Sequence, residues 1–153
     1  VSALLVGAAV AAGLSAGIVF AFSNFVMAAL DRLAGPEAVR AMQHINETVL
    51  NPAFLAVFMG TGVGLVALCA LAWQRGASLP PGLVVATLAY GVGVVGVTAL
   101  GNVPLNDGLA AVDAAAATPT TWWDFRTPWV RLNHVRTIAA TVASAALALA
   151  AAG

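Results

Sequence analysis

The stretch TVLNPAFLAVFMGTGVGLVALCALAWQ, residues 48–74, decides the fold, because it is longer than a membrane crossing and contains no charged residue. A helix rises about 1.5 Å per residue, so about 20 apolar residues cross roughly 30 Å of hydrocarbon. Two further uncharged stretches cover residues 1–30 and 76–106, and the last one, 137–153, needs the turn before it to complete a crossing. We therefore predict an all-α integral membrane domain over residues 1–153, with four spans at 2–30, 51–73, 83–105 and 131–152.

The composition supports a membrane protein with one charged end. Hydrophobic residues make up 61% of the chain and charged residues 8%, against about 25% charged in soluble domains. All charged residues except Arg75 lie within 31–47 and 107–136, two regions that four spans place at the same end. Five of the six arginines are there, so the positive-inside rule favours this end for the cytoplasm. The expected location is the inner (plasma) membrane of a bacterium, in contact with membrane lipids.

Other features of the composition exclude whole classes of function. The formal net charge is zero and no basic tract exists, which argues against a nucleic-acid partner. The single cysteine, Cys69, lies within an apolar run, so one chain forms neither a disulfide nor a thiolate metal cluster. The absence of lysine and of a basic segment before the first span argues against a cleavable signal peptide.

Gly35-Pro36-Glu37 predicts the start of an interfacial helix that leads into the second span. Proline suits the first helical position, and an acidic side chain suits the first turn. At helical spacing, one face of this helix is apolar, with Ala38, Met42, Ile45 and Val49. The opposite stripe is polar, with Arg40, His44, Glu47 and Asn51. Two interpretations of His44, Glu47 and Asn51 stay open: a functional site, or a solvated face.

Two segments between the third and fourth spans carry further polar and aromatic side chains. Asn102 and Asn106 are one turn apart at the end of the third span, and Pro104 between them frees a carbonyl. Polar groups at membrane depth need partners, so these amides either cap the helix or belong to a site. Residues 122–129, which include Trp129, predict an aromatic-rich loop before the fourth span. It serves either as an interfacial anchor or as a lid over a flat aromatic ligand.

The fourth span carries a polar stripe into the bilayer. Its members recur at helical spacing and are Asn133, Thr137, Thr141 and Ser144. His134 and Arg136 flank the top of the stripe. Ionisable groups in membrane spans nearly always face the interior of the bundle, so we predict a pocket on this face that opens at one end only.

Small residues at helical spacing predict close packing of the spans. Examples are Gly13 and Gly17 in the first span, Gly60 and Gly64 in the second, and Gly91, Gly93 and Gly96 in the third. In lipid, such residues let helix backbones approach closely. The expected architecture is a four-helix bundle, assembled as a homo-oligomer.

Three motifs, in this order among four spans, carry a resemblance to a known family. They are Met42-Gln43-His44-Ile45-Asn46, Asn102-Val103-Pro104-Leu105-Asn106-Asp107 and Arg131-Leu132-Asn133-His134-Val135-Arg136-Thr137. Together they resemble the small integral-membrane family that includes the fungal anthrone oxygenases. The third motif is the most specific of the three, and the resemblance extends over essentially the whole chain.

The resemblance implies an oxygenase that uses molecular oxygen, without haem or flavin, to convert the activated methylene of a lipophilic polycyclic phenol to a quinone carbonyl. On this hypothesis His134 or His44 removes the proton, since an unperturbed histidine pKa is about 6.5. Arg136 and Arg131 then stabilise the oxyanion and the developing superoxide. Asn133 is counted with the catalytic residues, where it orients a phenol oxygen. The remaining candidate binding residues are Asn102, Asn106, Trp129, Glu47 and Thr137.

Two alternatives to this mechanism remain open from the sequence. His44, Glu47 and His134 offer two imidazoles and a carboxylate, the ligand set of many non-haem iron sites, and the two histidines alone are possible haem ligands. Iron, copper or haem would then make the protein a redox-active metalloprotein. The second alternative is a non-catalytic accessory or binding subunit, which would tolerate substitution of both histidines.

Overall fold

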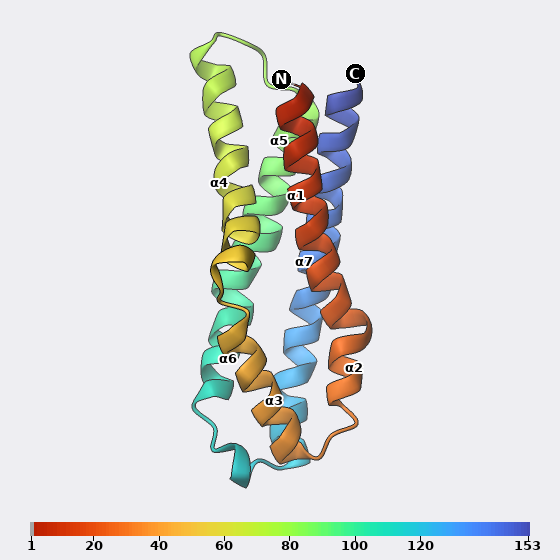
Figure 1. Ribbon diagram of the computed structural model, residues 1–153, viewed down its shortest axis with the longest axis vertical. Helices are drawn as coiled ribbons and strands as arrows, with labels where there is room; N and C mark the ends of the chain where they lie inside the picture. The colour runs from red at the N-terminus through yellow and green to blue at the C-terminus, as the bar shows by residue number, and fades with distance from the viewer. Residues whose placement is uncertain (1) are drawn as a thin grey trace.

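The computed structural model describes residues 2–153, which form four long helical rods and a shorter helix (Figure 1). The first rod contains α1 (Ser2–Ala21), the π-helix η1 (Phe22–Val26) and α2 (Met27–Leu30). The second rod is α4 (Pro52–Gln74). The third rod contains α5 (Pro81–Leu88), the π-helices η2 (Ala89–Gly96) and η3 (Thr98–Asn102), and α6 (Val103–Ala110). The fourth rod is α7 (Pro119–Ala152).

All four rods are long and apolar enough to cross a membrane. Residues 2–153 contain no strand, so the predicted all-α membrane bundle is confirmed. The first rod covers the predicted span 2–30, and the second begins at Pro52, one residue after the predicted start of the span 51–73. The third and fourth rods extend beyond the predicted spans 83–105 and 131–152 at the charged end.

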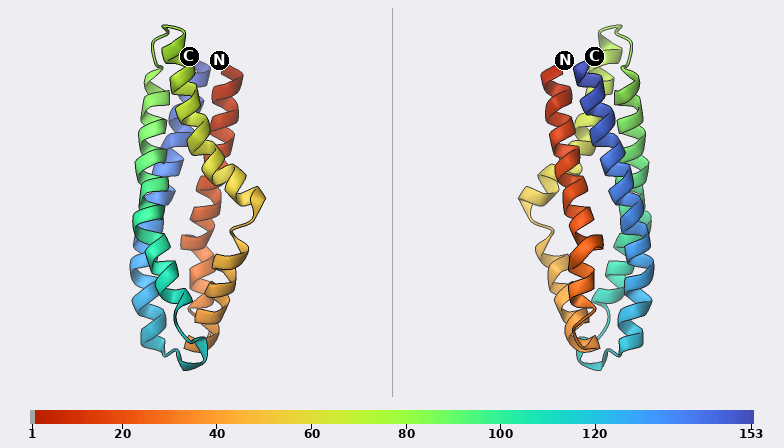
Figure 2. Two further views of the ribbon diagram at one scale, coloured as in Figure 1. Left: turned by 90° about the vertical axis from the view of Figure 1, so that its left-hand side faces the viewer. Right: turned by 90° about the vertical axis from the view of Figure 1, so that its right-hand side faces the viewer.

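The charged connections lie together at one end of the bundle, as the sequence predicted. Both ends of the chain lie with the 75–80 turn at the opposite end (Figure 1). The predicted amphipathic helix is α3 (Gly35–Thr48), with Ala38 and Met42 buried. It runs along the bundle axis, and its junction with α4 stands away from the other rods (Figure 2). Asn51 caps α4 there, because its Oδ1 accepts a hydrogen bond of 3.0 Å from the Phe54 amide.

The half of the bundle that holds the chain ends is packed with small side chains. We name its buried cluster the terminal core, and its members are Leu5, Ala9, Ala12, Ala16, Phe58, Leu65, Leu83, Ala86, Tyr90, Val94, Ala140, Ala143 and Leu147. Close helix contact occurs at Gly93, where a Cβ atom would collide with the Ala139 side chain. At Gly13 a Cβ atom would lie 3.1 Å from Ser144 Oγ, whereas Gly17, Gly60, Gly64 and Gly91 have open space. The predicted glycine contacts are therefore formed at only some of the predicted positions.

The other half of the bundle contains a second cluster, which is richer in large side chains. We name it the loop core, and its members are Met27, Leu30, Ala38, Val39, Met42, Leu109, Ala114, Ala117, Trp122, Phe125, Trp129 and Val130. The predicted aromatic-rich loop is wrong in one respect, because residues 122–129 are part of α7. Thr118 caps that helix in a reciprocal hydrogen-bond pair with Thr121, and Pro119 occupies its first turn. Before α7 the chain leaves α6 at Ala110 and forms one short 3₁₀ turn, η4, over Ala114–Ala116.

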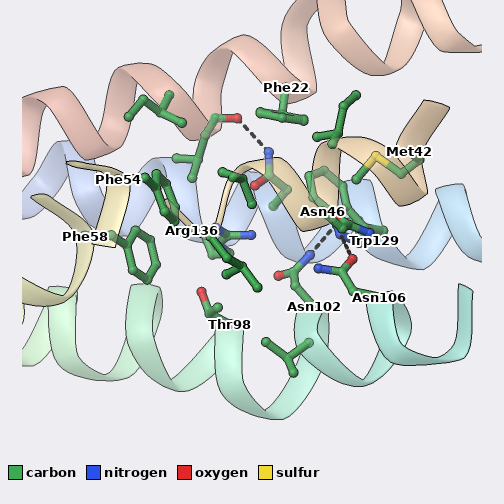
Figure 3. Close-up of a pocket in the computed structure, with 17 residues that line it drawn as sticks. Phe22, Met42, Asn46, Phe54, Phe58, Thr98, Asn102, Asn106, Trp129 and Arg136 are labelled. Atoms are coloured by element: carbon green, nitrogen blue, oxygen red, sulfur yellow. Dashed lines mark hydrogen bonds between the residues drawn. The ribbon is translucent and has the colours of Figure 1, made fainter. Parts of the chain in front are cut away.

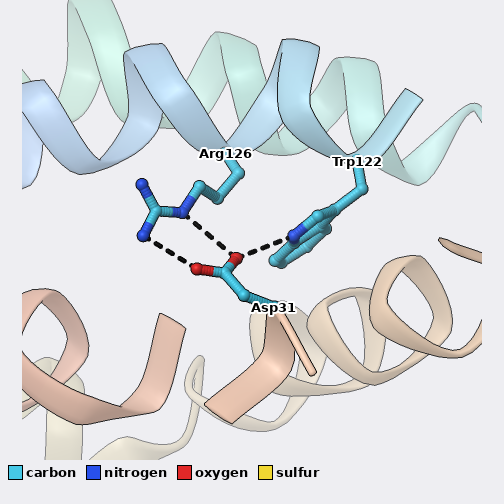
Figure 4. Close-up of polar contacts among 3 residues, drawn as sticks. All are labelled: Asp31, Trp122 and Arg126. Atoms are coloured by element: carbon cyan, nitrogen blue, oxygen red, sulfur yellow. Dashed lines mark hydrogen bonds and ion pairs between the residues drawn. The ribbon is translucent and has the colours of Figure 1, made fainter. Parts of the chain in front are cut away.

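An ion pair joins the first rod to α7 in this half of the bundle (Figure 4). Arg126 donates to both carboxylate oxygens of Asp31, at 3.1 and 2.9 Å. Trp122 Nε1 donates to the same carboxylate at 2.9 Å. Two of the predicted interfacial groups, Trp122 and Arg126, therefore fasten α7 to the first rod.

Candidate functional site

A cavity of about 110 Å³ lies between the two cores (Figure 3). Its apolar wall is largely aromatic and includes Phe22, Phe54, Phe58 and Trp129. Its polar wall contains Asn46, Thr98, Asn102, Asn106, Asn133 and Arg136. The polar residues come from α3, the third rod and α7, so the cavity exists only when these elements pack together. Thr98 and Asn102 lie in η3, and π-helical segments inside α-helices are frequent at functional sites.

Arg136 is the single charged residue among those that line this cavity. It is 7% exposed, and its guanidinium carbon lies 5.7 Å from the centre of the Phe58 ring. Its Nε is buried and donates to no group within residues 2–153. Among the described residues, neither the Arg126–Asp31 ion pair nor the His44–Glu47 contact involves it. The cavity wall therefore presents a cation whose charge no carboxylate of the described chain neutralises.

Asn133 and Asn102 each use the amide nitrogen for the protein and leave the oxygen without a partner. Asn133 Nδ2 donates to the Val19 carbonyl and to Ser23 Oγ, both at 2.6 Å. Asn102 Nδ2 donates to the Trp129 carbonyl at 3.2 Å. Within residues 2–153, both Oδ1 atoms are buried without a hydrogen-bond donor. Because such groups normally find partners, these two acceptors in one cavity wall are available to hydrogen-bond donors of a molecule that enters the cavity.

Asn106 and Asn46 differ in whether their amide groups have hydrogen-bond partners in the protein. Asn106 Oδ1 accepts a hydrogen bond of 2.8 Å from Trp129 Nε1, which fixes both side chains. Asn46 Nδ2 is buried and has no acceptor in the described part of the chain. The cavity thus offers unused donors on Asn46 and Arg136, and unused acceptors on Asn102 and Asn133.

A second cavity, of about 470 Å³, lies next to the first; we name it the vestibule. Five residues line both spaces, and they are Asn46, Val49, Leu50, Val103 and Asn106. The vestibule also has three carboxylate side chains, from Glu47, Asp107 and Asp113. It shares these wall residues with the inner cavity and is itself open to the surroundings.

The structure brings together half of the residues that the sequence proposed. Those that line the inner cavity are Asn102, Asn106, Trp129, Asn133 and Arg136. Those that do not line it are His44, Glu47, Arg131, His134 and Thr137.

The residues outside the cavity have identifiable positions. Arg131 and His134 are exposed. Thr137 is half-buried, and its hydroxyl donates to the Asn133 carbonyl at 2.9 Å. His44 Nδ1 lies 3.7 Å from Glu47 Oε2 on the exposed stripe of α3, and Glu47 lines the vestibule. A direct role for His134 in the cavity therefore has no geometric support.

Helix geometry separates His134 from Arg136. Successive side chains of an α-helix are rotated by about 100° around its axis. Two side chains that are two positions apart are therefore about 200° apart, on nearly opposite faces. Trp129, Asn133 and Arg136 are spaced by four and three residues, which places them on one face. Since that face is buried, His134 must turn outward.

The alternative metal ligands are not brought together. Within residues 2–153, no group of three His, Cys, Asp or Glu side chains is arranged to hold a metal ion. His44 and Glu47 are neighbours, but His134 does not join them. The proposed set of two imidazoles and a carboxylate therefore does not fit this arrangement of the chain.

Several cavity residues were not identified as site residues from the sequence. They are Phe22, Asn46, Phe54, Phe58 and Thr98. Thr98 was predictable, because it continues the spacing of four from Asn106 and Asn102 and so lies on the same face. Asn46 belongs to the first of the three motifs. It lies beside the polar stripe of α3 and does not follow the helical spacing of that stripe, so it was not identified as a site residue. The three phenylalanines resemble any apolar span residue, so nothing in the sequence distinguishes them.

Comparison with protein families places this cavity in a known context. The family model described as anthrone oxygenase matches residues 47–146. The chain belongs to the anthrone oxygenase family. The match to this anthrone oxygenase model includes Asn102, Asn106, Trp129, Asn133 and Arg136. Comparison with curated proteins and with solved structures found no match.

Proposed function

We propose that the protein is a membrane oxygenase that converts the activated methylene of an anthrone, a lipophilic polycyclic phenol, to a quinone carbonyl. Molecular oxygen is the co-substrate. The membrane is the inner (plasma) membrane of a bacterium, from which the substrate partitions into the bundle. The family membership supports this type of chemistry.

The observation that carries the proposal is the unneutralised guanidinium of Arg136 in an aromatic cavity. A buried charge is costly unless something compensates for it. An anthrone that has lost a methylene proton is an anion with its charge delocalised onto the carbonyl oxygen of the middle ring. With one outer ring in this cavity, the anion directs that oxygen to Arg136, while the phenolic hydroxyl of the inserted ring donates to Asn102 Oδ1 or Asn133 Oδ1. The aromatic walls pack against the inserted ring.

The proposed reaction balances without a bound cofactor, because the substrate anion itself supplies the electrons. Loss of the methylene proton gives the anion, which transfers one electron to oxygen. The resulting radical and superoxide join through a new C–O bond, and protonation gives a hydroperoxide. Cleavage of its O–O bond, with loss of the remaining methylene hydrogen as a proton, forms the carbonyl and releases water. One CH₂ group and one O₂ are thus converted to one C=O group and one H₂O.

Arg136 acts by stabilising the anion, since a preorganised cation in a site that excludes water is worth more than one in solution. Among the described residues that line the inner cavity there is no histidine or carboxylate, so the methylene proton leaves through the vestibule. Glu47 lies there, paired with His44, and Asp107 lies on the other wall. These groups accept the proton and pass it to solvent.

The test is oxygen uptake by detergent-purified protein with 1,8-dihydroxyanthrone, corrected for spontaneous oxidation in protein-free detergent. Wild type is compared with Arg136→Met and with Arg131→Met, which removes an exposed arginine from the same helix. We expect Arg136→Met to lower kcat/KM by about 100-fold or more, the usual effect of removing an oxyanion-stabilising donor. Arg131→Met should stay within about twofold of wild type, as expected for an exposed charge.

Equal rates for wild type and Arg136→Met would contradict the assigned role of Arg136. If the wild type consumes no oxygen above the blank but binds the quinone in an Arg136-dependent manner, the protein is a binding subunit instead. Quinone binding is measured in the same preparation by quenching of tryptophan fluorescence, since Trp129 lines the cavity.

A further inference from the structure

The inner cavity is too small for the whole of a fused-ring ligand. Its volume is about 110 Å³, and a buried apolar cavity of about 150 Å³ holds one benzene molecule. Typical ligand sites have volumes of about 300–1,000 Å³. The inner cavity therefore accommodates a single ring, with its oxygen substituent near Arg136.

The vestibule provides the missing volume directly beside it. Its volume of about 470 Å³ falls within the range of ligand sites. Residues on both sides of the passage line both spaces: Asn46, Val49 and Leu50 near the end of α3, and Val103 and Asn106 on α6. We name these residues the doorway. A flat molecule is the shape that extends through such a passage between two helices.

We propose that the vestibule is a distal subsite of the ligand site, so that a fused-ring ligand extends through the doorway with one outer ring in the inner cavity, its reacting middle ring at the doorway and its far ring in the vestibule. This inference rests on the proposed function, which supplies the class of ligand. The inner cavity recognises the inserted ring and its oxygen substituent, and the vestibule selects what the far ring carries.

The doorway residues have different parts in this arrangement. Asn106 is held by Trp129 Nε1, so its oxygen is already used. Asn46 Nδ2 is buried and has no acceptor within residues 2–153, so it donates to an oxygen on the ligand. Leu50 is 65% exposed and Val103 is 41% exposed, and they provide the apolar edges that contact the middle ring.

The charge of the vestibule defines the substituents that it accepts. Its three carboxylates, Glu47, Asp107 and Asp113, accept hydrogen bonds from hydroxyl groups on the far ring. A carboxylate on that ring would meet like charges and be disfavoured. The subsite therefore selects hydroxylated far rings over carboxylated ones.

The test narrows the doorway and compares a large probe with a small one. The variants are Val103→Phe and Leu50→Phe, with Leu100→Phe as the matched control, because Leu100 is 85% exposed and lines neither space. The large probe is 1,8-dihydroxyanthraquinone, detected by quenching of tryptophan fluorescence. The small probe is 4-fluorophenol, which has one ring and is detected by fluorine NMR line broadening. Neither assay needs turnover, so failure of the oxygenase proposal leaves this test intact.

We expect both doorway variants to weaken anthraquinone binding by about tenfold or more, as steric changes in a pocket do, with fluorophenol binding unchanged. Leu100→Phe should bind both probes as wild type does. Full-strength anthraquinone binding in both doorway variants would overturn the proposal. So would an equal loss of both probes, because the passage would then be a general entrance and not a subsite. A wild type that binds 1,8-dihydroxyanthraquinone no more tightly than its 2-carboxylate derivative would overturn the assigned selectivity.

Discussion

The two cores of the bundle are held together by different forces. In the terminal core, alanine and glycine let the rods approach, and the main polar contact is the Tyr90 hydroxyl, which donates to the Phe58 carbonyl at 2.9 Å. In the loop core, tryptophan and phenylalanine fill the space, and the Asp31–Arg126 pair joins the rods. The first pattern is typical of helices in lipid, where close packing stabilises the bundle. The second is typical of a region in contact with water.

The cavity lies where these two ways of packing meet. Phe58 of the terminal core and Met42 and Trp129 of the loop core all line it. Because small side chains on one side and large ones on the other do not fill the same space, a cavity at this boundary is a natural outcome.

The largest effect on stability is expected in the terminal core. Gly93→Leu should destabilise the bundle by about 3 kcal/mol, because the added side chain collides with Ala139 and overpacking is costly. The measurement is the Tm in detergent, followed by circular dichroism. Gly91→Leu, two residues away at a position with open space, is the control and should change the Tm little. Equal Tm values for the two variants would show that backbone approach does not hold this core together.

A smaller loss is expected from the loop core. Asp31→Ala removes the acceptor of Arg126 and Trp122, and hydrogen bonds to a charged group contribute about 2 kcal/mol. The same Tm measurement detects this change, and the control is Asp124→Ala, at an exposed position in α7. An unchanged Tm in Asp31→Ala would mean that aromatic packing alone stabilises this half.

Replacement of the buried cavity residue Arg136 should change the stability in the opposite direction. Arg136→Met should raise the stability by about 1 kcal/mol, since replacing a buried charge by an apolar side chain of similar size is often stabilising. Arg131→Met, at an exposed site, should leave the Tm unchanged. A marked fall in the Tm of Arg136→Met would show that the guanidinium contributes to folding and is not reserved for a ligand.

The smallest effect is expected for His134. His134→Ala should keep oxygen uptake within about twofold of wild type, because His134 is exposed and does not line the cavity, whereas loss of a general base typically costs about 100-fold or more. His44→Ala, next to Glu47 of the vestibule, is the comparison and should slow uptake more. A loss of about 100-fold in His134→Ala would restore His134 as the base and require a different conformation of α7.

The sequence was sufficient to predict the rods, because uncharged length is a direct requirement of the bilayer. It also predicted the start of α3 and the sorting of charge to one end. It failed at residues 122–129, which it predicted as an aromatic-rich loop. Thr118 and Pro119 form the start of a helix that includes these residues, and Pro128 lies inside that helix. Homo-oligomerisation stays a prediction.

The site was less predictable than the rods, for a geometric reason. A polar cluster such as Asn133-His134-Val135-Arg136 contains groups on opposite faces, and only packing decides which face is buried. The sequence predicted that the face of α7 with Asn133 points inward, and Arg136 lies on that same face. The partners of the cavity come from three other segments, and the phenylalanines among them have no distinguishing pattern in the sequence. Their positions follow only from the packed bundle.

Because Thr98 and Asn102 lie in a π-helical turn, the directions of their side chains depend on the number of residues in that turn. A π-turn contains one more residue than an α-helical turn. In η3 such a turn is closed by the hydrogen bond that the Val103 amide donates to the Thr98 carbonyl, five residues earlier. Deletion of Ala99 would let this wide turn close into an ordinary α-helical turn, so the parts of the rod on its two sides would keep their relative orientation. Inside the turn, Thr98 and Asn102 would lie three residues apart instead of four, and their side chains would no longer point into the cavity in the same directions. The rod would still span the membrane. A one-residue length change, invisible to hydropathy, would therefore separate membrane insertion from ligand recognition.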